Sequence, residues 1–233
     1  MKANELTEMA VLDTETTGVD VFNDRIVTAF LGLMTPTGEW TEKKSWIINP
    51  GIEISQGAID VHGITNERAV AEGVDAADGI FSILQAIDIY DRKGIPVAAY
   101  NAAFDFTILK SEAERYGWPF RAPRFILDGY VIDKKLDPYR KGKRQLGVTA
   151  KHYGFEMTNA HDAEADCEAA GRVTYRLLKH KWLFDKELSY IHDKTVEHAK
   201  EQAAGLQAYF RKTDPSAIVD GTWPIRSRSE GAG

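Results

Sequence analysis

An apolar run that ends in two carboxylates constrains this chain more than any other stretch. Residues 9–12 are apolar, and Asp13 and Glu15 follow, separated by one residue. Side chains on a strand alternate between its faces, so both carboxylates would point the same way. Two like charges at the end of a buried strand repel each other and lose hydration. A divalent cation that prefers oxygen ligands, Mg²⁺ or Mn²⁺, would relieve both costs, whereas the alternative is a strand end with two solvated acids.

The overall charge and the cysteine content limit the classes of protein that this chain can represent. The chain has 233 residues, a formal net charge of −6 and one cysteine, Cys167. A negative chain does not bind nucleic acid through bulk charge, so an anionic substrate needs a local basic patch or metal ions. A single cysteine excludes an internal disulfide framework and fits a reducing compartment. The polar N-terminus and the lack of an apolar run long enough to cross a bilayer predict a cytoplasmic protein without a membrane contact.

The order of the predicted elements indicates an α/β fold. Strand patterns come first, joined by short turns, and strands alternate with helices afterwards. This order predicts a mixed central sheet, an antiparallel meander plus parallel strands, flanked by helices. The predicted strands after the first cover 25–34, 39–48, 96–100 and 125–128, and the predicted helices cover 76–92, 102–116, 145–153 and 162–180.

The last fifty residues differ from the rest of the chain. Apolar residues recur every three or four positions from Leu188 to Phe210, which predicts one amphipathic helix of about six to seven turns. Its apolar stripe must bury against the core, against a second copy of the chain, or against another protein. Pro215 ends the pattern, and a frayed tail is expected from Gly221 onward. We therefore expect a domain over 1–182, a helical extension over 183–214 and a largely irregular tail over 215–233.

Two later segments carry further acids on inward-facing helix positions. Asn101 stands where a helix N-cap belongs, so Asp105 lies about one turn inside the helix, on the face of its apolar residues. Asp166 shares a face with small apolar residues of the last core helix. His161 lies at the entrance of that helix, where it can reach the same site. Each residue alone has an ordinary explanation, a favourable helix dipole for Asp105 and a surface position for His161.

Taken together, the three segments resemble the exonuclease motifs of a known family. Asp13-x-Glu15, Asn101-x3-Asp105 and His161-x4-Asp166, in this order, look like the three motifs of the His-containing subclass of DEDD exonucleases (DEDDh). That family includes the proofreading epsilon subunit of bacterial DNA polymerase III. The segments 13–18, 61–65 and 101–105 match it as well, and the resemblance covers about residues 9 to 180.

The resemblance implies a ribonuclease-H-like fold and a 3′–5′ exonuclease that removes nucleoside 5′-monophosphates from single-stranded or frayed ends. It implies two Mg²⁺ or Mn²⁺ ions, with His161 as the general base that activates water. The metal ligands that it implies are four carboxylates, those of Asp13, Glu15, Asp105 and Asp166. The residues that it places against the terminal nucleotide are Thr16, His62 and Phe104, for which a core position of Phe104 and a turn-stabilising hydrogen bond of His62 are the alternatives.

Several other functions stay open at this point. The same family contains RNA-trimming exoribonucleases, and the preference for DNA over RNA rests only on the similarity of the motifs to the epsilon group. A non-catalytic nucleic-acid-binding module is a further alternative, as is a polymerase accessory that acts through the C-terminal helix. The basic residues between 134 and 144, which include Lys141, Lys143 and Arg144, either steer a nucleic-acid backbone towards the acids or form a solvated loop.

Overall fold

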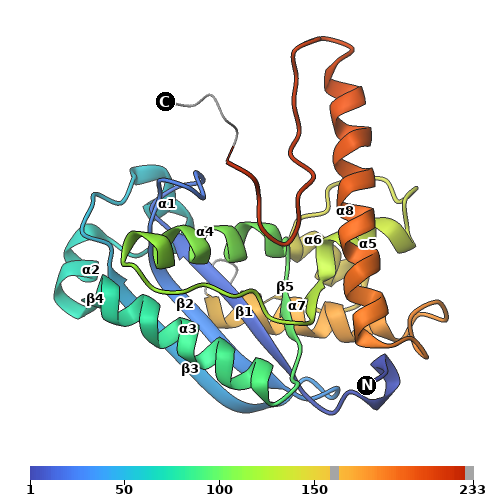
Figure 1. The fold of residues 1–233 in the computed structure, drawn as a ribbon, viewed down its shortest axis with the longest axis horizontal. Coiled ribbons are helices and arrows are strands. Elements are labelled where there is room, and N and C mark those ends of the chain that lie inside the picture. The colour runs from blue at the N-terminus through green and yellow to red at the C-terminus, as the bar shows by residue number, and fades with distance from the viewer. Residues whose placement is uncertain (158–162, 229–233) are drawn as a thin grey trace.

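The computed structural model describes residues 1–157 and 163–228 and shows one mixed sheet flanked by helices (Figure 1). The strand order is β4-β3-β2-β1-β5-β6. The pairs β1–β2 and β2–β3 are antiparallel, and the pairs β1–β5, β5–β6 and β3–β4 are parallel. The predicted combination of a meander with parallel strands is confirmed. The strands are β1 (Met9–Thr16), β2 (Ile26–Met34), β3 (Trp40–Asn49), β4 (Val74–Asp75), β5 (Val97–Ala99) and β6 (Ile126–Asp128).

Most helices lie where the periodicity places them. The helices of the described residues are the short 3₁₀ helix η1 (Ala3–Glu5), α1 (Gln56–His62), α2 (Asn66–Glu72), α3 (Ala76–Arg92), α4 (Ala102–Arg115), α5 (Gly129–Leu136), α6 (Leu146–His152), α7 (Ala163–Leu178) and α8 (Leu188–Phe210). The sequence patterns did not predict α5, because Lys134 and Lys135 in its last turn begin the basic run that continues to Arg144. The carboxylate of Asp128 caps this helix by accepting from the backbone N–H groups of Tyr130 and Val131.

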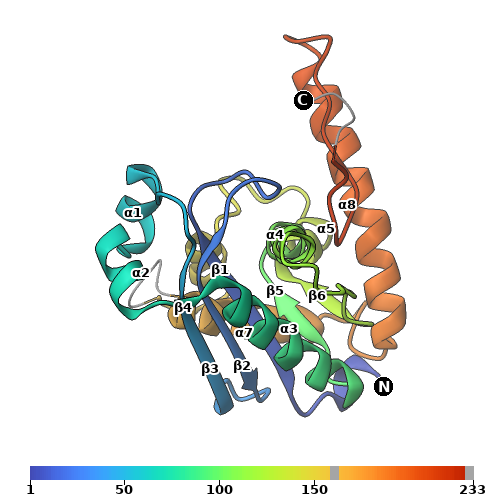
Figure 2. The same ribbon diagram turned by 60° about the vertical axis from the view of Figure 1, so that its left-hand side comes forward.

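The sheet separates two apolar cores, and β1 contributes to both. Ala10 and Leu12 point to the core beneath α3 and α4, whereas Met9 and Val11 point to the core beneath α7. Figure 2 shows the helices on the two sides of the strands. The alternation along β1 continues beyond its apolar part, so Thr14 lies on the α4 side, and the carboxylates before and after it lie on the α7 side.

The basic segment that follows α5 contains a buried ion cluster. Asp133 is fully buried, and its carboxylate accepts hydrogen bonds from the guanidinium groups of Arg140 and Arg144 at 2.6–3.0 Å. The hydroxyl of Tyr153 donates to the same carboxylate at 2.7 Å. Arg144 is therefore a structural residue, and this part of the steering hypothesis is wrong. Lys141 is exposed in the same segment.

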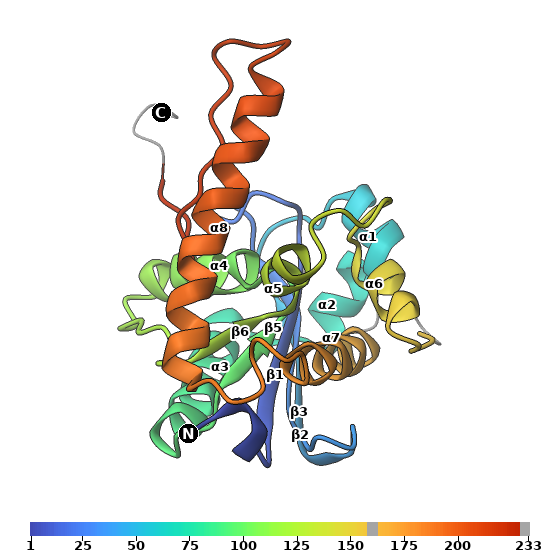
Figure 3. The same cartoon turned by 90° about the vertical axis from the view of Figure 1, so that its right-hand side faces the viewer.

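Helix α8 is only half packed against the rest of the protein. Leu188 and Ile191 are buried, but Leu206 and Phe210 are each 43% exposed on the half that projects away from the sheet (Figures 1 and 3). Burial of the stripe against the core therefore holds for its first half. None of the described helices is both long enough and apolar enough to cross a membrane.

The chain after α8 turns back and packs on the core. Trp223 is 7% exposed, and its indole N–H donates to the carboxylate of Asp128 at 3.0 Å. The backbone N–H of Arg226 donates to the hydroxyl of Thr107 on α4 at 2.9 Å. The expectation of a frayed tail is therefore wrong for residues 221–228, because these contacts anchor them.

Candidate active site

Strand β1 presents Asp13 and Glu15 where its neighbour β5 has ended. The parallel pairing of β1 with β5 involves only Ala10 and Val11 of β1, whereas the pairing with β2 continues to Thr16. The two carboxylates thus follow the end of the parallel pairing, on the α7 side of the sheet. In parallel α/β sheets, binding sites form beyond the carboxyl ends of the strands.

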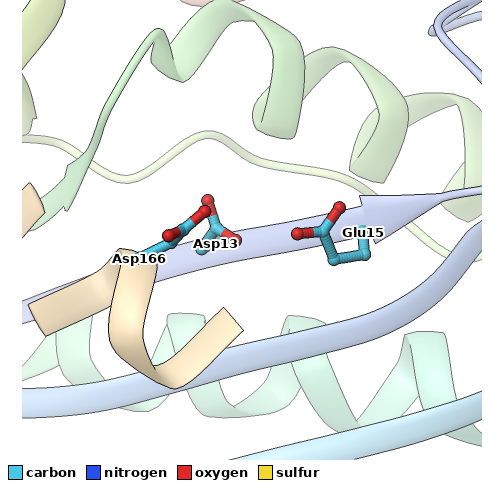
Figure 4. A group of neighbouring side chains, drawn as sticks. All are labelled: Asp13, Glu15 and Asp166. Atoms are coloured by element: carbon cyan, nitrogen blue, oxygen red, sulfur yellow. The ribbon is translucent and has the colours of Figure 1, made fainter. Parts of the chain in front are cut away.

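Helix α7 brings the third carboxylate to the same place. One carboxylate oxygen each of Asp13, Glu15 and Asp166 lies within 4.8 Å of the others (Figure 4). The helix approaches the sheet closely at Gly171, where an added Cβ would lie 2.6 Å from the sulfur of Met34. A larger residue at this position would have to displace the Met34 side chain, so the position of Asp166 depends on this close packing.

Asp105 reaches the acids from the opposite side of the sheet. It lies in the first turn of α4, is 4% exposed, and accepts a hydrogen bond from the Thr14 hydroxyl at 2.8 Å. Its charge raises the pKa of Asp13. The four predicted carboxylates are therefore near one another. Three form one close group, and Asp105 lies near enough to bind Thr14 and to repel the charge of Asp13.

The electrostatics of the group favour a bound cation. Burial raises the pKa of Asp13 well above its usual value, and the charges of Asp105, Glu15 and Asp166 raise it further. Burial also raises the pKa of Asp105 to about 7, although the hydrogen bond from Thr14 opposes this effect. Such carboxylates need protons or a cation to lie this close together. The donor set, all carboxylate oxygen, fits Mg²⁺ or Mn²⁺.

The raised pKa values predict how the stability of the metal-free protein depends on pH. A carboxyl group whose pKa is higher in the folded state binds its proton more tightly there, so protonation stabilises the fold. The metal-free protein should gain about 1 kcal/mol from Asp105 alone as the pH falls from about 8 to about 6. Mn²⁺ competes with these protons, so it should raise the melting temperature most at the higher pH. Thermal unfolding with Mn²⁺ and with a chelator at both pH values measures this, and an Mn²⁺ effect that does not change with pH would contradict it.

The predicted substrate contacts Phe104 and Thr16 lie within the described residues, whereas the predicted general base does not. His161 lies outside the described residues, so its role stays a prediction. Phe104 is partly buried and packs against the core beneath α4. Thr16 is 7% exposed, and its hydroxyl donates to the backbone carbonyl of Gly18.

His62 has a structural role in the turn after α1. Its Nδ1 accepts from the backbone N–H of Ile64 at 3.1 Å, so Nε2 carries the proton and faces the Thr16 carbonyl at 3.3 Å. Burial lowers the pKa of this imidazole, which keeps it neutral. His62 and Glu15 line one hollow of about 270 Å³. The turn-stabilising hydrogen bond is thus present, and the partly exposed ring still lines the same hollow as Glu15.

The start of α4 is held by a residue that the motifs did not reveal. Asn101 precedes the helix as predicted, but its side chain makes no capping bond and its φ is +70°. The buried carboxylate of Asp128 instead accepts from the backbone N–H groups of Asn101 and Ala102, both at 3.0 Å. Trp223 donates to the same carboxylate. The tail therefore stabilises the turn that places Asp105, and only the aromatic character of Trp223 could have suggested a buried anchor.

Replacing Trp223 with phenylalanine should destabilise the protein by about 2 kcal/mol, because a buried carboxylate loses a hydrogen-bond donor. Trp118 offers a matched control, since its buried indole N–H has no hydrogen-bond partner among the described residues. Urea unfolding of Trp223→Phe and Trp118→Phe measures the difference. Equal losses in the two variants would show that the bond to Asp128 contributes nothing.

Comparison with known proteins assigns the chain to a family. Residues 10–174 match the RNase T family model, described as an exonuclease. DNA polymerase III PolC-type of Streptococcus mutans is 30% identical over 179 residues, which are 77% of this chain and 12% of that protein. The chain thus spans about an eighth of the length of that relative.

Solved structures of exonucleases share the fold. The Escherichia coli exonuclease I complex with single-stranded DNA has a TM-score of 0.65 at 18% identity, covering 87% of this chain and 45% of that one. The nuclease domain of 3′hExo, a DEDDh family member bound to rAMP, has a TM-score of 0.63 at 14% identity, covering 78% and 97%. The family match and the arrangement of the acids confirm the resemblance found in the motifs: the chain belongs to the DEDD-type exonuclease family.

Proposed function

We propose that this protein is a divalent-metal-dependent 3′–5′ exonuclease that releases nucleoside 5′-monophosphates from single-stranded or frayed ends, with DNA favoured over RNA. The close group of Asp13, Glu15 and Asp166 is the observation that carries the proposal. A protein that only binds nucleic acid would gain nothing from carboxylates whose burial and mutual repulsion are costly.

In this proposal the chain's own residues bind the ions and prepare the water. Asp13, Glu15 and Asp166 hold one Mg²⁺ or Mn²⁺, and Asp13 with Asp105 supports a second. Bound divalent ions supply Lewis-acid activation of the water and stabilisation of the leaving 3′ oxygen. His161 accepts the proton of the attacking water through a neutral imidazole.

The residues beside the acids would position the terminal nucleotide. Phe104 offers a stacking surface that tolerates any base, and His62 borders the hollow next to Glu15. Thr16 would contribute a backbone contact, because its hydroxyl already donates to Gly18.

The direction and the sugar preference can be tested together. Digestion of DNA and RNA oligonucleotides that carry a label at either the 5′ or the 3′ end, with Mn²⁺, should shorten 5′-labelled strands one nucleotide at a time. It should release a labelled mononucleotide at once from 3′-labelled strands, and DNA should be consumed faster than RNA. Immediate release of the 5′ label as a mononucleotide would contradict the direction.

A second role, contact with a polymerase or with a second copy of the chain, is favoured by the projecting half of α8. Leu206 and Phe210 are exposed there, and a matching relative is a polymerase. Removing residues 186–233 would also remove Trp223, so point substitutions are the better test. Leu206→Gln with Phe210→Gln should abolish binding to the polymerase or self-association while leaving digestion of free oligonucleotides intact. A double variant that keeps both the polymerase binding and the self-association of the parent would exclude this role.

A further inference from the structure

The segment between α7 and α8 displays basic and aromatic side chains in alternation. Residues 179–182 are Lys-His-Lys-Trp, and Figure 3 shows the link that joins α7 to α8. A hollow of about 530 Å³ is lined there by Arg176, Lys179 and Lys181. We call Arg176, Lys179, Lys181 and Trp182 the basic surface.

The cations of the basic surface are not held in ion pairs by the described residues. Its three cations are exposed, and none of them forms an ion pair with a residue of 1–157 or 163–228. Asp137 is the single acid among the described residues that line the hollow, and it lies 3.9 Å from His152. A concentrated positive patch on a chain with a net charge of −6 is complementary to a polyanion.

The aromatic part of the surface is held in an exposed position. Trp182 is 58% exposed, and its ring meets the ring of His180 edge to face, with centroids 5.1 Å apart. The backbone N–H of Trp182 donates to Nδ1 of His180, which fixes that ring. Trp182 also lines an adjoining hollow of about 420 Å³ with Tyr190, which is 45% exposed. Proteins bind single-stranded nucleic acids with cations that contact the phosphates and with exposed aromatic rings that stack on the bases.

Stabilisation of helix ends explains only part of this composition. Cations near the C-terminus of a helix complement its dipole, which accounts for Arg176 and Lys179 at the end of α7. The dipole effect falls off within the last turn, so it does not account for Lys181 or for an exposed tryptophan beyond it.

We propose that the basic surface binds single-stranded nucleic acid upstream of the 3′ end that the carboxylates hold. The proposal rests on the exonuclease function proposed above. Asp166 and Leu178 are twelve residues apart on α7, about 18 Å at 1.5 Å per residue. At ~3.4 Å per stacked nucleotide, a strand needs about five nucleotides to span this distance. The basic surface therefore contacts long strands, whereas a trinucleotide whose 3′ end lies at the carboxylates is too short to reach it.

Two sets of variants test the site in an Asp13→Asn background, which prevents digestion. Lys179→Gln with Lys181→Gln should lower the salt dependence of binding to an oligothymidylate of about twelve nucleotides. The slope of log affinity against log salt should fall by about 1.4, so the affinity lost between about 50 and about 200 mM salt becomes roughly sevenfold smaller. Trp182→Leu should weaken binding about tenfold, and Trp182→Phe should restore most of it, because a phenyl ring still stacks on a base.

Lys93→Gln with Lys200→Gln is the matched control, because both lysines are exposed and the change in net charge is the same. A salt slope equal in the two double variants would overturn the proposal, as would a Trp182→Leu variant that binds like the parent. In the enzyme with Asp13 intact, the ratio of kcat/KM for the long strand to that for a trinucleotide should fall about tenfold in the Lys179/Lys181 variant. Failure of the exonuclease proposal would appear separately, as labelled strands left intact by the parent, since the binding measurements do not depend on cleavage.

Discussion

Replacing Asp13 with asparagine should lower the exonuclease rate by about 10³-fold or more. The charges of all three other carboxylates raise the pKa of Asp13, so it lies close to each of them. Metal ions contribute several kcal/mol of transition-state stabilisation, and each 1.36 kcal/mol is a factor of ten in rate. The measurement is mononucleotide release from a labelled oligonucleotide at saturating Mn²⁺.

The loss should not come from unfolding. Removing one of several repelling carboxylates relieves repulsion, so the metal-free Asp13→Asn variant should be at least as stable as the parent. Asp193→Asn, which changes an exposed acid of α8, is the control and should leave the rate unchanged. Activity of Asp13→Asn within tenfold of the parent would remove Asp13 from the reaction.

Replacing Asp133 with asparagine should lower the free energy of unfolding by about 3–5 kcal/mol, more than any other substitution proposed for this protein. Asp133 is fully buried, and its loss leaves the guanidinium groups of Arg140 and Arg144 without their anionic partner. For a chain of this size the melting temperature should fall by roughly 10 °C.

The control for Asp133 lies in the same segment. Lys141→Gln with Lys143→Gln changes two exposed cations and should alter stability by less than about 0.5 kcal/mol. Thermal unfolding of both variants distinguishes a structural cluster from a solvated loop. An Asp133→Asn variant as stable as the lysine variant would show that the buried ion pairs add nothing.

Much of the fold was accessible from local patterns. The period of helix α3 and the alternation along β1 are local properties, and they predicted these elements closely. The same alternation placed Asp13 and Glu15 on one face. Helical periodicity, which is also local, placed Asp105 and Asp166 on inward-facing positions, and the family motifs grouped them with the other two acids.

The features that were missed depend on contacts between distant parts of the chain. Asp128 caps α4 from another strand, and Trp223 reaches it across 95 residues of sequence, so no local pattern contains either bond. Helix α5 was obscured by lysines, and Arg144 appeared to be a surface cation because its partner Asp133 lies eleven residues earlier. Tertiary pairing decides such cases, and sequence periodicity does not report it.

Titration of Mn²⁺ into the metal-free protein, followed by calorimetry, tests the central claim most directly. The claim is that acids from β1, α4 and α7 converge to bind divalent metal. We expect saturable binding by the parent, loss of most of that binding in Asp13→Asn, and unchanged binding in Asp193→Asn. Binding of Mn²⁺ to the parent that is no tighter than to Asp13→Asn would contradict the metal site and the exonuclease mechanism built on it.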